Sequence, residues 1–180
     1  LLIGGAGFAI FKLLPTGKPD QNVPFQAMKI EPLTSNGKAT DAVISPDGRH
    51  VVYALDDGGK RSLWLRQVAT MTDVQLREPD SDVIYRSLTI SRDGDFLYYV
   101  DDGTSIRNRI LYQMPLVGGS PKKIVENIAT PIGLSPDGKQ MAFARSREKE
   151  SVMIIANADG TGERELANRP GNSSYASLFA

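Results

Sequence analysis

The sequence predicts an all-β fold, a partial β-propeller of about three four-stranded blades, preceded by the end of a transmembrane helix. The main observation is the tetrapeptide Ser-Pro-Asp-Gly, which occurs twice, with one near copy between the two. The aspartates of the three copies recur at intervals of 46 and 44 residues, and short apolar segments flank each copy. A fixed period of roughly 40–45 residues built on short strands is typical of propeller blades. An apolar segment at the start of the chain predicts the helix.

The repeated tetrapeptide is predicted to be a structural turn. Proline presets the second turn position, aspartate suits the third, and glycine adopts the left-handed conformation that realigns the two strands. Serine can bond the turn backbone through its hydroxyl. We assign no catalytic, cofactor-binding or metal-ligating residue to this chain. The site residues that we predict are turn residues only: Ser45, Pro46, Asp47 and Gly48; Ser91, Asp93 and Gly94; and Ser135, Pro136, Asp137 and Gly138.

Each turn lies between the first and second strands of a predicted blade, and the blades cover about 39–76, 85–125 and 128–166. The predicted first strands are Ala39–Ile44, Tyr85–Ile90 and Ile128–Leu134. The second strands, His50–Ala54, Phe96–Val100 and Gln140–Ala144, are apolar almost throughout. That composition suits strands covered on both faces, here by neighbouring blades.

The first 34 residues divide into three predicted segments. Residues 1–14 are apolar for eleven positions, too few to cross a bilayer alone, and are interpreted as the end of a transmembrane helix. Residues 15–24 contain three prolines and a glycine and are interpreted as a linker. Residues 25–34 precede the first blade and are predicted to be an outer strand that closes the ring, within an incomplete propeller over 25–180.

Composition excludes several classes of site. The chain has no cysteine, so it has neither disulfides nor thiolate metal ligands. Basic and acidic residues balance at 21 each, and nothing in the charge favours a nucleic-acid partner. The single histidine, His50, is expected at a solvent-facing hairpin position. Two acidic pairs, Asp56-Asp57 and Asp101-Asp102, are expected to be solvated hairpin tips, with calcium binding as the alternative. Trp64 is expected in the core rather than on a binding surface.

These repeats resemble the TolB-type propeller, a family of usually six-bladed domains, so about three of an expected six blades are present. Longer strings resemble the extracytoplasmic region of membrane-anchored bacterial serine/threonine protein kinases. They include LTSNGKAT at 33–40, GGKRSLWLRQVA at 58–69, LYQMPLVGG at 111–119 and IANADGTGER at 155–164. The resemblance covers about Phe25 to Ala180. The kinase motifs themselves are absent from this sequence, so no kinase residue carries over.

The resemblance implies a non-catalytic domain that senses or binds a protein or small molecule, on a kinase whose catalytic domain lies upstream. ATP and magnesium are then expected only in that upstream domain. The implied location is the inner membrane, single-pass, with the propeller in the periplasm or extracytoplasmic space, and the chain could form a homodimer. Two alternatives remain open: a periplasmic TolB-like scaffold that binds envelope proteins, and the propeller of a prolyl-oligopeptidase-like peptidase.

Overall fold

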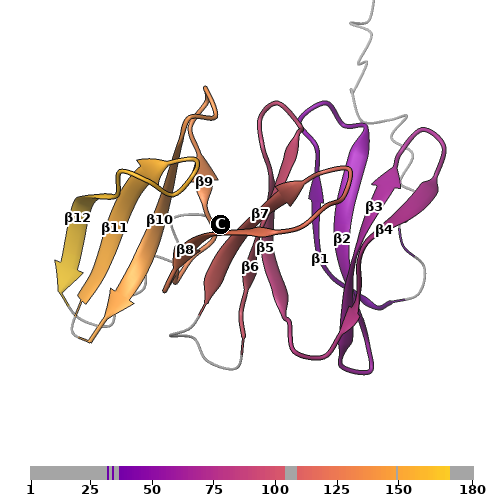
Figure 1. Ribbon diagram of the computed structural model, residues 1–180, viewed down its shortest axis with the longest axis horizontal. Helices are drawn as coiled ribbons and strands as arrows, with labels where there is room; N and C mark the ends of the chain where they lie inside the picture. The colour runs from indigo at the N-terminus through magenta and orange to yellow at the C-terminus, as the bar shows by residue number, and fades with distance from the viewer. Residues whose placement is uncertain (1–31, 33, 35–36, 104–108, 149, 171–180) are drawn as a thin grey trace, which may run out of the picture. The chain divides into compact units, whose positions relative to one another are not determined.

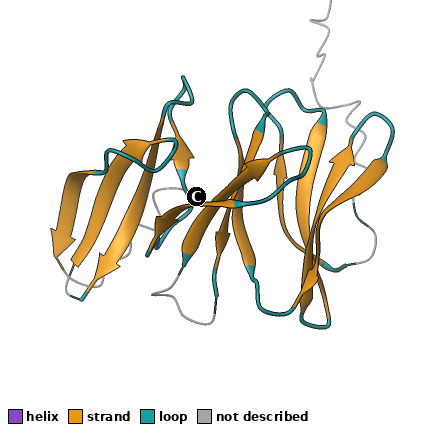
Figure 2. Cartoon of the chain, viewed as in Figure 1, coloured by secondary structure: helices purple, strands orange, loops and turns teal. Residues whose placement is uncertain are grey.

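The computed structural model describes residues 32, 34, 37–103, 109–148 and 150–170. The chain divides into two units, Leu1–Ser35 and Asn36–Ala180, and the second contains every described strand. The described residues form twelve β-strands and no helix (Figure 2). In this part of the chain there is accordingly no helix with the length and hydropathy of a membrane span. The predicted helix end at 1–14 and linker at 15–24 lie outside the described residues, as does 25–34 apart from Pro32 and Thr34.

The strands form three four-stranded sheets, each an antiparallel meander (Figure 1). The first sheet contains β1 (Ala39–Ile44), β2 (His50–Asp57), β3 (Lys60–Gln67) and β4 (Thr72–Asp80). The second contains β5 (Tyr85–Ile90), β6 (Phe96–Asp101), β7 (Ile110–Pro115) and β8 (Lys122–Glu126). The third contains β9 (Gly133–Leu134), β10 (Gln140–Arg147), β11 (Glu150–Asn157) and β12 (Arg164–Pro170). The fold class predicted from the repeats, an all-β partial propeller, is confirmed.

One predicted strand differs from the structure. The sequence predicts a strand over Ile128–Leu134, whereas β9 contains only Gly133 and Leu134. Pro131 has no N–H to donate to a neighbouring strand. Ahead of it, the Thr130 hydroxyl accepts the Ala144 N–H at 2.9 Å, a bond that takes the place of a backbone partner. The apolar residues of this segment still pack in the core, so burial alone produced the strand-like pattern.

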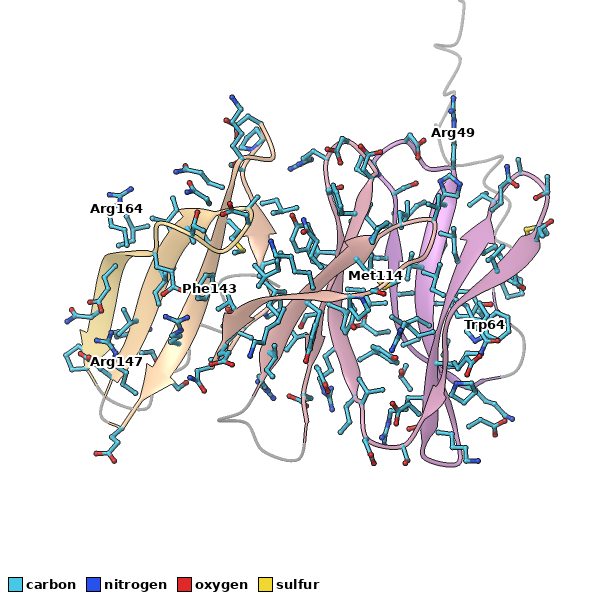
Figure 3. All side chains as sticks on the ribbon, in the orientation of Figure 1. Arg49, Trp64, Met114, Phe143, Arg147 and Arg164 are labelled. Atoms are coloured by element: carbon cyan, nitrogen blue, oxygen red, sulfur yellow. The ribbon has the colours of Figure 1, made fainter. Side chains whose placement is uncertain are left out.

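Two apolar clusters join the sheets. The first contains side chains of the first and second sheets, among them Val52, Leu63, Leu97 and Met114. The second contains side chains of the second and third sheets, among them Tyr98, Leu111, Phe143 and Ile154. Figure 3 labels Met114 and Phe143, one from each cluster.

Strand β6 shows why the second strands are apolar on both faces. Leu97 and Tyr99 lie in the first cluster, whereas Tyr98 and Val100 lie in the second. Because successive side chains of a strand point to opposite faces, this strand is covered by a sheet on each side. The continuous apolar pattern therefore predicted a central strand correctly.

Candidate functional site

The three repeated turns share one hydrogen-bond network. In the first, the Ser45 hydroxyl donates to the Asp47 carboxylate at 2.6 Å and accepts the His50 N–H at 2.9 Å. The same carboxylate accepts the Arg49 N–H at 3.0 Å, and Gly48, at φ 71°, donates its N–H to the Ser45 carbonyl at 2.9 Å. The turns at Ser91 and Ser135 repeat these bonds. Each serine and aspartate of the three turns is therefore bonded within its own turn.

The turn carboxylates are held in their charged form by these bonds. The serine hydroxyl is the main cause that lowers the pKa of Asp47, Asp93 and Asp137, and a backbone N–H adds to the effect. A hydrogen bond to the charged form favours it, which explains the direction. Each of the three carboxylates stabilises the turn that contains it, and the three turns belong to three separate sheets.

Two arginines, Arg61 in β3 and Arg109 directly before β7, connect their hairpins to the segment that leads to the next sheet. Arg61 donates hydrogen bonds from Nε to the Asp56 carboxylate at 3.1 Å and from Nη1 to the Val83 carbonyl at 3.3 Å. Arg109 likewise donates from Nε to the Asp102 carboxylate and from Nη1 to the Ala129 carbonyl at 3.2 Å. These arginines link consecutive sheets through their side chains.

The acidic pairs at the hairpin ends are less solvated than the sequence suggested. Asp56, Asp101 and Asp102 are half-buried, and only Asp57 is exposed. Asp101 accepts the Ile84 and Gly103 N–H groups at 3.1 and 3.0 Å. Asp102 accepts hydrogen bonds from the Nε atoms of two arginines, from Arg86 at 2.7 Å and from Arg109. Among the described residues no group of three acidic or histidine side chains is placed to hold a metal ion.

His50 and Trp64 both belong to the first sheet. His50 is half-buried at the start of β2, where its backbone N–H completes the turn. Trp64 is half-buried in β3, opposite Tyr53 and Gln75, and its Nε1 donates to the Ser62 hydroxyl at 3.0 Å. Trp64 belongs to neither apolar cluster, so its predicted core position is only partly met.

The candidate site is a polar depression between β1 and β5, with a volume of about 530 Å³. We call it the β1–β5 depression. Its lining includes Thr40, Asp41, Asp56, Arg61, Arg86 and Ser87. A smaller depression of about 50 Å³ shares Arg86, Ser87 and Pro131 with it and adds Asp102 and Arg109.

Backbone irregularities shape both walls of the β1–β5 depression. The register of β1 shifts between Ala39 and Asp41, and that of β5 shifts between Arg86 and Thr89. Within the second irregularity Ser87 has φ 56°, a left-handed conformation that a serine rarely adopts. The Asp41 carboxylate connects the two walls. It accepts hydrogen bonds from the Leu88 N–H of β5 at 3.4 Å and from the Ala42 N–H of β1 at 2.9 Å.

Apart from Asp56, none of these residues was predicted from the sequence as a candidate site residue. Asp41, Ser87 and Pro131 each stand six residues before the aspartate of a repeated turn. This shared position could have predicted that the three residues lie in corresponding parts of their repeats. The correspondence is hard to recognise in the sequence, because the three residues are of different types.

The comparisons with known proteins show the fold. No protein-family model matches the sequence, and no curated protein matches it. Among solved structures, a TolB protein from Agrobacterium tumefaciens is 17% identical with a TM-score of 0.63, and the match covers 77% of this chain and 52% of that one. An oligogalacturonate lyase from Vibrio parahaemolyticus is 15% identical with a TM-score of 0.60, covering 77% of this chain and 43% of that one.

Dipeptidyl peptidase 4 from Porphyromonas gingivalis is 14% identical with a TM-score of 0.60, covering 79% of this chain and 27% of that one. The chain thus spans about half, or less, of the length of these structures. The three proteins have different names and share the blade architecture with this chain, so the likeness concerns the fold. This chain has the fold of TolB-like β-propeller blades.

Proposed function

We propose that this chain is the non-catalytic, extracytoplasmic binding region of a membrane-anchored bacterial serine/threonine protein kinase. The observation that carries the proposal is the series of TolB-like blades that follows an apolar segment and a proline-containing linker. In this proposal the catalytic domain, with its ATP and magnesium, lies upstream of the helix in the cytoplasm. The blades lie on the other side of the inner membrane.

The strings that carry the kinase resemblance support the proposal because they fall on defined parts of the blades. Residues 58–69 form the β2–β3 hairpin and β3, and residues 155–164 include the end of β11 and the turn that follows it. These segments differ between the three blades, whereas the repeated turns recur in all of them. They are therefore more specific than the repeat itself.

The binding role rests on the β1–β5 depression, which brings several unlike polar groups to one place. A protein or small-molecule signal bound there would act on the kinase through the helix, with dimerisation as one route.

A second candidate function is a periplasmic TolB-like scaffold that binds envelope proteins. The match to the Agrobacterium TolB structure, with its TM-score of 0.63, favours it. A third is the propeller of a peptidase, which the match to dipeptidyl peptidase 4 favours.

The test is phosphotransfer by the protein encoded by the complete reading frame. We expect the full-length protein to phosphorylate itself on serine or threonine in the presence of magnesium and ATP. We expect a version lacking residues 25–180 to retain that activity, because the blades are non-catalytic. A mature exported protein without phosphotransfer would favour the scaffold, and a downstream hydrolase domain with peptidase activity would favour the third candidate.

A further inference from the structure

We infer that the β1–β5 depression binds a small carboxylate ligand that also carries a hydrogen-bond donor, such as a hydroxy acid or an amino acid. The inference rests on the proposed function, a propeller that binds a signal, and names the ligand class and the residues that hold it. Arg86 would bind the carboxylate of the ligand, and Asp41 would accept a hydrogen bond from the donor group of the ligand.

Arg86 is the arginine of this region in which both terminal nitrogens, rather than one, are free of hydrogen bonds to the described residues. Its Nε donates to Asp102 at 2.7 Å, and within the described part of the chain its two terminal nitrogens make no hydrogen bond. Arg61 and Arg109 instead use a terminal nitrogen to bind a backbone carbonyl. The Arg86 side chain is 62% exposed and lines both depressions. Its outer edge can therefore bind a carboxylate in the bidentate geometry that a guanidinium favours.

Arg86 shares its carboxylate partner with a second guanidinium group. Asp102 is 14% exposed, and this one carboxylate pairs with both Arg86 and Arg109. Two guanidinium groups thus share a single negative charge. Asp56 does not pair with Arg86, because its carboxylate accepts hydrogen bonds from the Gly59 N–H at 2.7 Å and from Arg61 Nε at 3.1 Å.

Asp41 supplies the complementary acceptor on the β1 wall. Its two oxygens accept the Ala42 and Leu88 N–H groups at 2.9 and 3.4 Å. A carboxylate offers about four acceptor positions, so two remain for a ligand. Leu88 is two residues from Arg86, and its bond to Asp41 joins the two walls, so that Asp41 and Arg86 line the same depression. A ligand with a carboxylate and a nearby hydroxyl or ammonium group matches this pair.

The backbone next to Arg86 is strained. Ser87 lies between Arg86 and Leu88 at φ 56°, within the register shift of β5. Conformations of this kind concentrate at binding sites, where the surrounding structure maintains them, and strand irregularities often occur beside such sites. The volume of about 530 Å³ lies within the range of roughly 300–1,000 Å³ that is usual for small-molecule sites.

The experiment is calorimetric titration of the full-length protein with two sets of probes. One set contains the standard amino acids, and the other contains lactate, gluconate and glucuronate. Lactamide and glucose serve as probes without a carboxylate. We expect saturable binding by members of one set, weakened about 10- to 100-fold by Arg86→Gln and by Asp41→Asn, as for the loss of a charged hydrogen bond. The matched control is Arg49→Gln, because Arg49 lies in a turn with a side chain 80% exposed (Figure 3).

The outcomes separate this inference from the proposed function. Absence of binding by every probe, or equal binding by Arg86→Gln and wild type with both shown folded by circular dichroism, would overturn the inference. Autophosphorylation by the same preparation would leave the proposed kinase context standing. Conversely, binding that depends on Arg86 in a protein without phosphotransfer would support the site and remove the kinase.

Discussion

The serine of each repeated turn both donates and accepts a hydrogen bond, so its hydroxyl holds two parts of the turn at once. We expect Ser91→Ala to lower the free energy of unfolding by about 1–2 kcal/mol, because the Phe96 N–H and the Asp93 carboxylate each lose a partner. Urea unfolding followed by circular dichroism measures this loss. The control is Ser81→Ala, whose exposed hydroxyl donates only to Asp82 at 3.2 Å. Equal losses in the two variants would contradict the role of the turn network.

The turn aspartates predict a loss of stability in acid. The pKa values of Asp47, Asp93 and Asp137 are lowered from an ordinary value of 3.8, mainly by the serine hydroxyls. A group whose folded pKa is depressed stabilises the fold fully above its unfolded pKa, and this contribution disappears as pH falls through the folded value. We therefore expect the urea midpoint to fall as the pH drops below about 4. Ser91→Ala should make the decline shallower, whereas an unchanged pH profile in that variant would count against the assigned cause.

The turns and the candidate site differ in how far sequence could predict them. A turn is local, so its geometry is determined by four consecutive residues, as in Ser45, Pro46, Asp47 and Gly48. The pairing of Asp41 with the β5 wall depends on two register shifts in different sheets. An alternating pattern cannot show such shifts, because each one displaces the side chains that follow it.

At the scale of elements, the turn after β11 packs against β8 so closely that only glycine fits. A Cβ on Gly160 would lie 2.5 Å from the Ile124 carbonyl oxygen, and its φ of 86° already disfavours other residues. We expect Gly160→Ala to cost about 2–5 kcal/mol of unfolding free energy, the sum of left-handed strain and overpacking. The comparison is Gly48→Ala, which has φ 71° and nothing within 4 Å of the added carbon. It should lose only the strain, about 1–2 kcal/mol.

Urea unfolding of both variants tests whether this contact joins the second and third sheets. Tyr98 adds to the same contact, because its hydroxyl donates to the Ala158 carbonyl at 3.4 Å. Similar losses in Gly160→Ala and Gly48→Ala would mean that the sheets separate at this point without cost. Strand positions were predictable from period and apolar pattern, but this contact was not, since it joins residues 36 positions apart in different repeats.

At the scale of the whole molecule, equivalent positions in the three sheets have different partners. Arg66 stands opposite Val51 as Met114 stands opposite Leu97, and Met114 is buried between two sheets. Arg66 instead pairs with Asp73 and lies over the ring of Tyr53, 5.8 Å from its centroid. The repeat predicts an apolar residue at position 66. Instead, the Arg66–Asp73 pair covers a face of the first sheet that no other described sheet covers.

We expect the isolated 180-residue chain to self-associate through the outer faces of its terminal sheets. The outer face of the first sheet carries Ile44, Tyr53 and Trp64. Ile44 is 59% exposed, and all three residues lie outside both apolar clusters. In the third sheet Met153 and Ile155 are half-buried and likewise outside the clusters. Faces of this kind in repeat proteins associate unless another repeat or a polar cap covers them.

Sedimentation velocity over a wide range of concentrations measures this association, and we expect the weight-average coefficient to rise with concentration. Replacing Ile44 with lysine should reduce the effect, because a charge on the exposed face must be desolvated on contact. The control is Val117→Lys, at a turn position that is 86% exposed and belongs to neither terminal sheet. A monomer at every concentration, with one sharp unfolding transition, would mean that these faces need no neighbour and that the three sheets form a complete folding unit.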